Sequence, residues 1–194
     1  MAKTKKKKSS DPILAAGGIV TRGRSKPVFA VVRLRRQKSW VLPKGKLNKD
    51  ETAIAAAKRE VIEETGHDVA VQHYLGSLNY ITSGRPKSVR FWHMEASRQP
   101  VAKLMKDVSA VRWLPLDQAI KKLTHDRERE FLAEFGVKVR EHLHAAKEES
   151  AREKAKTGDL FSGRRAHDQS GVRHRVGYSG PKDVIQFLWR WLRR

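Results

Sequence analysis

The chain has 194 residues, and its 42 Lys and Arg against 21 Asp and Glu give a formal net charge of +21. It contains no cysteine, which excludes a disulfide framework, a thiol nucleophile and a Cys-ligated zinc site. The length fits one domain with appendages, and no apolar run approaches the ~20 residues that span a bilayer. So large a charge indicates a polyanionic partner: a phosphate-rich ligand, nucleic acid or an acidic membrane surface.

The two ends carry about half of the excess charge. Residues 1–10 hold five lysines and no acid, and residues 147–194 hold 12 basic and 6 acidic residues. A like-charged run cannot bury itself, so we expect a disordered basic arm over residues 1–10. The apolar residues 13–20 that follow superficially resemble a signal peptide, but the stretch is short, contains two glycines and lacks an Ala-x-Ala cleavage site. We therefore expect a buried first strand there and a cytoplasmic protein.

Apolar and alternating segments separated by turn-forming residues predict strands, and Ala-, Glu- and Lys-rich segments without Gly or Pro predict helices. In chain order, the expected strands are 13–20, 28–34, 40–42, 69–75, 77–82, 89–96 and 111–114. The expected helices are 52–65, 116–123, 126 to about 156, and 181–194, with a loop over 157–180. The order predicts an α/β fold with a mixed sheet and a helical C-terminal extension.

These elements suggest one folded domain with basic and helical additions. We expect that domain over residues 11–146, a charged helix end and flexible linker over 147–180, and a short amphipathic helix over 181–194. The last helix could anchor to a membrane surface or dock on the domain or on another subunit. Its apolar part is short, which favours docking over anchoring. Docking on another subunit is one of the two possibilities and would make the chain an oligomer.

Three carboxylates share one stripe of the helix expected over 52–65. At about 100° per residue, Glu63 and Glu64 lie within about 60° of Glu60 on the helix surface. Like charges at these spacings repel, and a hard divalent cation removes the repulsion because carboxylate oxygens are its preferred ligands. A solvated acidic face is the alternative, and spacing alone leaves both readings open.

The segment around this stripe resembles a known motif, the Nudix box. It reads Gly45, five residues, Glu51, seven residues, Arg59-Glu60, the aliphatic Val61, one residue, Glu63-Glu64, one residue, and Gly66. All seven fixed letters match. The one departure is His67, where the box normally ends in an aliphatic residue; Val69 could take over that packing.

The resemblance to Nudix hydrolases implies a Nudix-type α/β/α sandwich over about residues 11–135 and an enzyme that cleaves phosphoanhydride bonds. It implies that Glu60, Glu63 and Glu64, with the main-chain carbonyl of Lys44 or Gly45, bind Mg²⁺ or Mn²⁺. Glu51 and Arg59 would brace the loop and helix. Such cations neutralise phosphate charge and activate water.

The general base is not assigned by the resemblance. Glu60 and Glu63 are both candidates, so the expected catalytic residues are Glu60, Glu63, Arg59 and Glu51. Some relatives carry a further acid just before the strand 111–114, where this chain has Ala110. Asp107 or Glu95 could substitute for it.

The segment Leu42-Pro43-Lys44-Gly45-Lys46 resembles the branch that acts on diadenosine polyphosphates and diphosphoinositol polyphosphates, as do residues 111–119 and 123–127. A polyphosphorylated small molecule is therefore the expected substrate. A ring of cations suits such a ligand. The expected substrate-binding residues are Arg33, Arg35, Lys44, Lys46, Lys87 and Arg90.

Other aromatic and imidazole side chains have a structural and a functional reading. Trp40 and Trp92 could stack on a base, although aromatic residues on strands are more often core. His93 could donate to a phosphate, but a hydrogen-bonded structural His is the commoner case.

Two alternative functions remain. The same site could act on nucleoside triphosphates, as a sanitising enzyme, or on RNA 5′-pyrophosphate ends. In a different class, the chain could be a nucleic-acid-binding protein whose basic tails bind phosphates weakly, with a secondary or inactive Nudix site.

Overall fold

The computed structural model describes residues 11–162, with side chains described over 11–153. Residues 11–153 belong to one compact unit. The strands are β1 (Ile13–Arg22), β2 (Val28–Leu34), β3 (Trp40–Val41), β4 (Lys44–Lys46), β5 (Val69–Thr82), β6 (Arg85–Ala96) and β7 (Val108–Leu114). The helices are α1 (Ala53–Thr65), α2 (Leu116–Lys122) and α3 (Asp126–Ser162).

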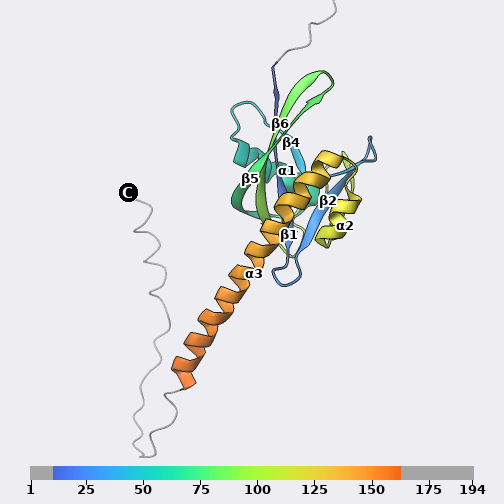
Figure 1. The fold of residues 1–194 in the computed structure, drawn as a ribbon. Helices are drawn as coiled ribbons and strands as arrows, with labels where there is room; N and C mark the ends of the chain where they lie inside the picture. The colour runs from blue at the N-terminus through green and yellow to red at the C-terminus, as the bar shows by residue number, and fades with distance from the viewer. Residues whose placement is uncertain (1–10, 163–194) are drawn as a thin grey trace, which may run out of the picture. The chain divides into compact units, whose positions relative to one another are not determined.

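The strands form one mixed sheet in the order β3-β2-β1-β6-β5, with β4 pairing with β1 and β7 with β2 (Figure 1). The pairing of β1 with β6 is parallel, and the others are antiparallel. This confirms the predicted α/β fold with a mixed sheet.

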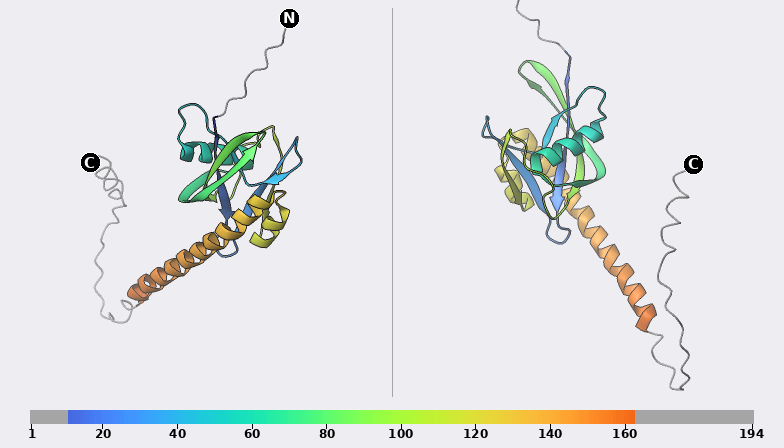
Figure 2. Two further views of the ribbon diagram at one scale, coloured as in Figure 1. Left: turned by 45° about the horizontal axis from the view of Figure 1, so that its top comes forward. Right: turned by 180° about the vertical axis from the view of Figure 1, so that it is seen from behind.

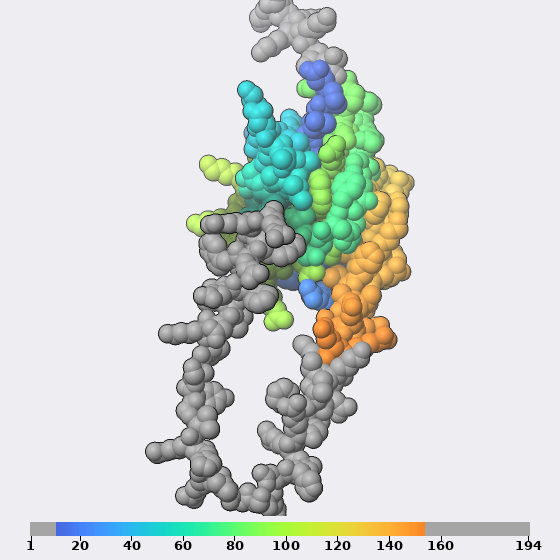
Figure 3. Space-filling view, turned by 90° about the vertical axis from the view of Figure 1, so that its left-hand side faces the viewer, coloured from blue at the N-terminus to red at the C-terminus, as the bar shows by residue number. Residues whose placement is uncertain are grey.

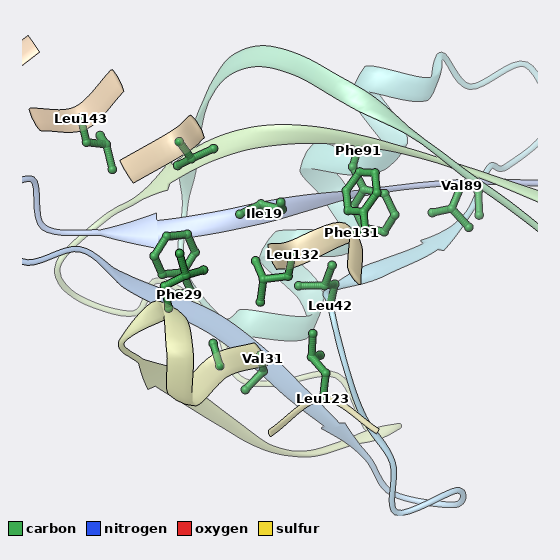
Figure 4. Close-up of a cluster of buried hydrophobic side chains, with 14 residues drawn as sticks. Ile19, Phe29, Val31, Leu42, Val89, Phe91, Leu123, Phe131, Leu132 and Leu143 are labelled. Atoms are coloured by element: carbon green, nitrogen blue, oxygen red, sulfur yellow. The ribbon is translucent and has the colours of Figure 1, made fainter. Parts of the chain in front are cut away.

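Helices cover both faces of the sheet, so the unit has three layers (Figure 2). The face under α1 is an apolar cluster that includes Ala56, Val61 and Met94. The opposite face packs under α2 and α3 and includes Phe29, Phe91 and Leu132 (Figure 4). Because side chains alternate along a strand, β1 supplies both cores: Ala16 and Val20 face α1, whereas Ala15 and Ile19 face the other helices.

β1 and β2 pair at only two positions, Thr21 with Phe29 and Arg22 with Val28. The two strands then separate, and β4 pairs with residues 15–17 of β1 in the space between them. Gly17 makes this close approach possible, since a Cβ there would overlap the Pro43 carbonyl and Lys44. β4 thereby brings the segment before the acidic helix against the centre of the sheet.

The acidic helix begins and ends where its sequence predicts. Thr52 is the N-cap, and its side chain accepts from the Ala55 amide. Gly66 ends the helix in the left-handed conformation, with φ 76°, and its amide donates to the Ile62 carbonyl at 2.8 Å. Its 13 residues hold the three carboxylates on one rigid element.

Several predicted boundaries differ from the structure. The expected strands 69–75 and 77–82 are one strand, β5, in which register shifts on either side of Tyr74 absorb the break. β6 begins four residues and β7 three residues earlier than expected. β4 was not predicted at all, because its three residues, Lys-Gly-Lys, carry no strand signal.

The long helix also differs at its end. α3 runs to Ser162, so the loop expected over 157–180 begins later. The basic arm at 1–10, the remainder of that linker and the helix expected over 181–194 lie outside the described residues. Within the described part of the chain, no helix is both long and apolar enough to cross a membrane.

Candidate active site

Two of the three carboxylates of α1 contact the same arginine. Arg59 donates through Nη1 to Glu60 Oε1 at 2.8 Å and to Glu63 Oε2 at 3.2 Å. The same guanidinium contacts both oxygens of Glu51 at 2.8 and 2.9 Å, and the Lys46 carbonyl at 3.1 Å. These charge-assisted contacts raise the pKa of Arg59 and join the loop that precedes α1 to the acidic stripe.

Glu51 is fixed from two sides. Besides the Arg59 pair, its Oε2 accepts from the Asn48 amide at 2.9 Å. The hydrogen bonds from Arg59 and then from Asn48 lower the pKa of Glu51 to about 2. Glu51 and Arg59 therefore connect residues 46–51 to α1.

Glu64 lies deeper than Glu63. Its side chain is buried, and Oε2 accepts from the Lys44 amide at 2.8 Å. Burial raises the pKa of Glu64 to about 7, and the charges of Glu60 and Glu128 act in the same direction, against Lys44. The positive charge near Glu64 is therefore too small to offset the cost of burying its ionised form.

Glu60 and Gly45 are in close contact. A Cβ at residue 45 would overlap the Glu60 carboxyl group, so a larger residue there would require this carboxyl group to move. Among residues 11–153, no three His, Asp or Glu side chains are grouped closely enough to hold a metal ion as they stand. The donor types that lie here, the carboxylates of Glu60, Glu63 and Glu64 and the Gly45 backbone, are those that a hard divalent cation prefers.

A group of cations lies on the opposite face of the sheet from α1, beside β4. On β4, Lys44 and Lys46 lie directly opposite Gly17 and Ala15 of β1, and on β6 Lys87 is two residues before Val89. Side chains at these positions point to the same face as Ala15 and Val89, which is the face away from α1. Burial lowers the pKa of Lys87, and the charges of Lys44 and Lys46 lower it further. Three of the six predicted substrate-binding residues therefore lie together.

The other three lie elsewhere. Arg35 donates to the carbonyls of Lys106 and Val108 at 2.9 and 3.3 Å, at the start of β7. Arg33 lies on β2 between Trp40 of β3 and Ala110 of β7. Arg90 is exposed on the α1 face of β6, in a hollow of about 150 Å³ shared with Leu14, Leu47 and Ala53.

Sequence reasoning did not select three further residues near these lysines. Tyr80 of β5 lies 5.9 Å from Lys87 Nζ and 4.0 Å from the Arg127 guanidinium, measured from its ring centroid. Glu128 of α3 is buried and pairs with Lys44 at 3.0 Å. The position of Glu128 could have been predicted from the sequence. Phe131, Phe135 and Val139 form an apolar stripe on α3, and one turn before Phe131 the same helix face carries Glu128.

The remaining candidates have structural surroundings. Asp107 is exposed at the start of β7, and Glu95 pairs with Arg24 at 3.2 Å at the far end of β6. Trp40 and Trp92 each pack against a core cluster. His93 is buried, and its Nε2 lies 2.9 Å from Thr21 Oγ1.

The departure from the motif at His67 has a packing explanation. The ring is buried edge-on against Trp113, with centroids 5.2 Å apart, and Nδ1 lies 2.9 Å from the Ser97 carbonyl. The His67 ring therefore occupies the apolar position of the motif while its Nδ1 is hydrogen-bonded, and Val69 is buried in the core under α1.

The chain is similar to several known proteins. It is 32% identical over 145 residues to the 8-oxo-(d)GTP phosphatase of Mycolicibacterium smegmatis, covering 70% of this chain and 45% of that protein. It is 34% identical over 85 residues to the asymmetrical bis(5′-nucleosyl)-tetraphosphatase of Rattus norvegicus, covering 41% of this chain and 58% of that one. The chain spans about half the length of the curated relatives it matches.

The fold has close structural counterparts. A C. elegans Ap4A hydrolase binary complex superposes with a TM-score of 0.58 at 24% identity, covering 66% of this chain and 97% of that one. The MutT protein of Methanosarcina mazei Go1 superposes with a TM-score of 0.57 at 22% identity, over 66% of this chain and 94% of that one. Residues 11–154, well over half of the chain, match the NUDIX domain, and the chain belongs to the NUDIX domain family.

Proposed function

We propose that the protein is a divalent-metal-dependent hydrolase that cleaves a phosphoanhydride bond in a polyphosphorylated small molecule. One observation carries the proposal: the carboxylates of Glu60, Glu63 and Glu64 lie next to β4, whose lysines gather with Lys87. Hydrolases of this family generally need a divalent cation such as Mg²⁺ or Mn²⁺.

Glu60, Glu63, Glu64 and the Gly45 carbonyl would hold the cation. When bound, it supplies charge neutralisation of phosphate oxygens and lowers the pKa of water. Little covalent work is left for the side chains, so their contribution is orientation and charge.

Each of the other residues has a role in this proposal. Arg59 holds Glu60 and Glu63 in one orientation against their mutual repulsion. Lys44, Lys46 and Lys87 bind phosphate oxygens. Glu63 is the proton acceptor for the attacking water, because its side chain is 39% exposed whereas that of Glu60 is 11% exposed.

Within this class we propose a dinucleoside polyphosphate, such as a diadenosine polyphosphate, as the first substrate candidate. The lysines and Arg127 extend the positive charge beyond what one diphosphate needs, and the similarity to tetraphosphatases and to an Ap4A hydrolase supports this choice. Diphosphoinositol polyphosphates present the same dense charge. An 8-oxo-(d)GTP substrate is the second candidate, favoured by the similarity over 145 residues to a phosphatase of that name.

The experiment is a substrate panel under one metal condition. It compares diadenosine polyphosphates, diphosphoinositols, 8-oxo-dGTP, ordinary nucleoside triphosphates and 5′-triphosphate RNA, with Mg²⁺ and then Mn²⁺. Glu63→Gln and Glu64→Gln are expected to lose at least about 100-fold in kcat/KM. Full activity of both variants on every substrate that the wild-type chain cleaves would show that the site is elsewhere.

The proposal of another class, a nucleic-acid-binding protein with a secondary or inactive site, makes the opposite prediction for the panel. No substrate would then be turned over, and RNA retention at low salt would be the measurable property. The basic ends that would bind RNA lie largely outside the described residues.

A further inference from the structure

A buried carboxylate outside the acidic motif contacts the candidate site from the other side of the sheet. Glu128 lies in the first turn of α3 and is 2% exposed. Its Oε2 accepts from the Leu42 amide at 2.7 Å, and its Oε1 lies 3.0 Å from Lys44 Nζ. Both oxygens are engaged, so Glu128 acts through other residues rather than on a substrate.

Lys44 links Glu128 to the carboxylates of α1. Its ammonium contacts Glu128 and donates to the Leu42 carbonyl at 3.1 Å, and its amide donates to Glu64 Oε2 at 2.8 Å. Between the two, the Pro43 carbonyl accepts from the Gly18 amide at 3.1 Å. The segment Leu42–Lys44 is therefore fixed to α3, to β1 and to α1 at once, and Leu42 packs beside Leu132 of α3 (Figure 4).

We propose that Glu128 is a positioning residue for this site. It holds the Leu42–Lys44 segment so that the Lys44 amide stays on Glu64 and the Lys44 ammonium stays within the lysine group. The inference rests on the proposed function for its effect on turnover, but its effect on cation binding can be tested without turnover.

The negative charge of Glu128 is the property that matters. The Lys44 side chain is 9% exposed and shares its surroundings with Lys87 and Lys46. An ammonium buried among other cations is unfavourable unless a carboxylate lies against it. Glutamine at 128 would still accept from the Leu42 amide but would not neutralise Lys44. Without this ion pair Lys44 would lose its attachment to α3, and the β4 backbone would shift away from Glu64.

The test compares two substitutions on the same helix in the full chain. Glu128→Gln removes the buried charge, and Glu134→Gln removes an exposed one that pairs with Lys138 at 3.2 Å. Mn²⁺ affinity is measured by electron paramagnetic resonance, and kcat/KM on whichever pyrophosphate the wild type cleaves. We expect Glu128→Gln to lower both by about tenfold and Glu134→Gln to change neither. Equal behaviour of the two variants would overturn the proposal.

A double variant separates positioning from loss of folding. Lys44→Met should weaken Mn²⁺ binding, and adding Glu128→Gln should weaken it no further, because Glu128 acts through Lys44. Additive effects would overturn the proposal. If Glu128→Gln alone does not fold, the test uses the double variant, which buries neither the Lys44 ammonium nor the Glu128 carboxylate. Wild-type Mn²⁺ affinity of the double variant would contradict the positioning role. A wild-type chain that cleaves nothing would refute the proposed function and leave these Mn²⁺ measurements decisive for Glu128.

Discussion

Arg59 and Glu51 connect the loop before α1 to the acidic stripe by two parallel hydrogen bonds of 2.8 and 2.9 Å. Such a pair fixes both groups in one plane, which a lysine could not do. Because the pKa of Glu51 falls from 4.5 to about 2 on folding, the pair has a defined pH dependence.

We predict the following for Glu51→Gln. The folded pKa lies below the unfolded one, so the contribution of Glu51 to stability is complete above pH 4.5 and declines as the pH falls toward 2. Thermal unfolding should therefore show the variant less stable than wild type at pH 6, with the difference shrinking between pH 4.5 and 2. Glu134→Gln serves as the control for an exposed pair, and a difference that is constant with pH would contradict this.

Gly45 gives a second prediction at this scale. Gly45→Ala would place a Cβ on the Glu60 carboxyl group, which must turn away. We expect Mn²⁺ affinity to fall by at least about tenfold while the fold is retained, since Glu60 can turn toward solvent. Isothermal titration with Mn²⁺ measures this.

Gly18→Ala is the matched control for Gly45→Ala. Its Cβ would meet only side-chain ends, Met94, Val20 and Val61, at 3.2–3.3 Å. It should lower the unfolding temperature slightly and leave Mn²⁺ affinity unchanged. Equal Mn²⁺ affinities of the two variants would show that contact with Glu60 does not explain the glycine.

At the scale of elements, α1 could be predicted closely because its signals are local. Thr52 caps it, Gly66 ends it, and the acidic stripe is a matter of spacing along one helix. β4 could not, because Lys-Gly-Lys becomes a strand only when β1 and β2 separate and leave the edge of β1 that faces away from β6 open at residues 15–17. Gly76 separates the two expected strands 69–75 and 77–82. In the structure Gly76 pairs with Phe91 of β6, so the chain continues as one strand.

The same distinction applies to the site. The motif carries the carboxylates in sequence, so Glu60, Glu63 and Glu64 could be identified. The cation group could be predicted only in part. Lys44 and Lys87 come together because β4 and β6 both pair with β1. Glu128, 84 residues from Lys44 in the chain, reaches them only because α3 packs on the sheet. The run DRERE does not itself distinguish Glu128 from its exposed neighbours; only the apolar stripe that follows it along α3 indicates which of these side chains faces the core.

The packing of α3 on the sheet includes a group of imidazoles. His73 of β5 lies 5.3 Å from His93 of β6 and 5.3 Å from His142 of α3, between ring centroids. Burial, and then the neighbouring imidazoles, lower the pKa of His93 to about 4; burial also lowers that of His73. His73 and His93 therefore pack in their neutral forms.

We predict that this group makes the unit acid-sensitive. The pKa of His93 is about 4 in the folded chain, against an ordinary value of 6.5. The unfolded chain therefore binds the proton first, and stability falls as the pH drops from 6.5 to 4. In His93→Gln this fall should be shallower when denaturant unfolding is followed across that range. His144→Gln, an exposed position on α3, should keep the wild-type slope; a wild-type slope in His93→Gln would contradict the prediction.

For the whole molecule, the candidate site is an acidic group within a strongly basic protein. In the space-filling view the first residues of β1 lie between the loop before α1 (cyan) and the β5–β6 hairpin (green) (Figure 3). A hollow of about 490 Å³ there is lined by three cations, Lys46, Lys49 and Arg85, and by two carboxylates, Asp50 and Glu51, the second of which is paired with Arg59. Positive charge on this side would attract phosphates to the carboxylates once a cation is bound.

The basic ends contribute about half of the net charge, and both cores and every candidate site residue lie between them. We therefore predict that a fragment of residues 11–153 keeps the kcat and KM of the full chain on its small-molecule substrate. It should bind single-stranded RNA more weakly, with a smaller dependence of log Kd on log salt, because fewer lysines and arginines displace counterions. Steady-state kinetics and fluorescence anisotropy at two salt concentrations measure the two properties.

A full chain with the five lysines of residues 1–10 changed to glutamine is the control for this truncation. It should reproduce part of the loss in RNA affinity without shortening the chain, since the charges rather than the backbone bind phosphates. RNA binding by the fragment that equals that of the full chain would assign the polyanion contact to the folded unit instead. A fragment that folds but loses turnover would mean that residues beyond 153, or the basic arm, complete the active site.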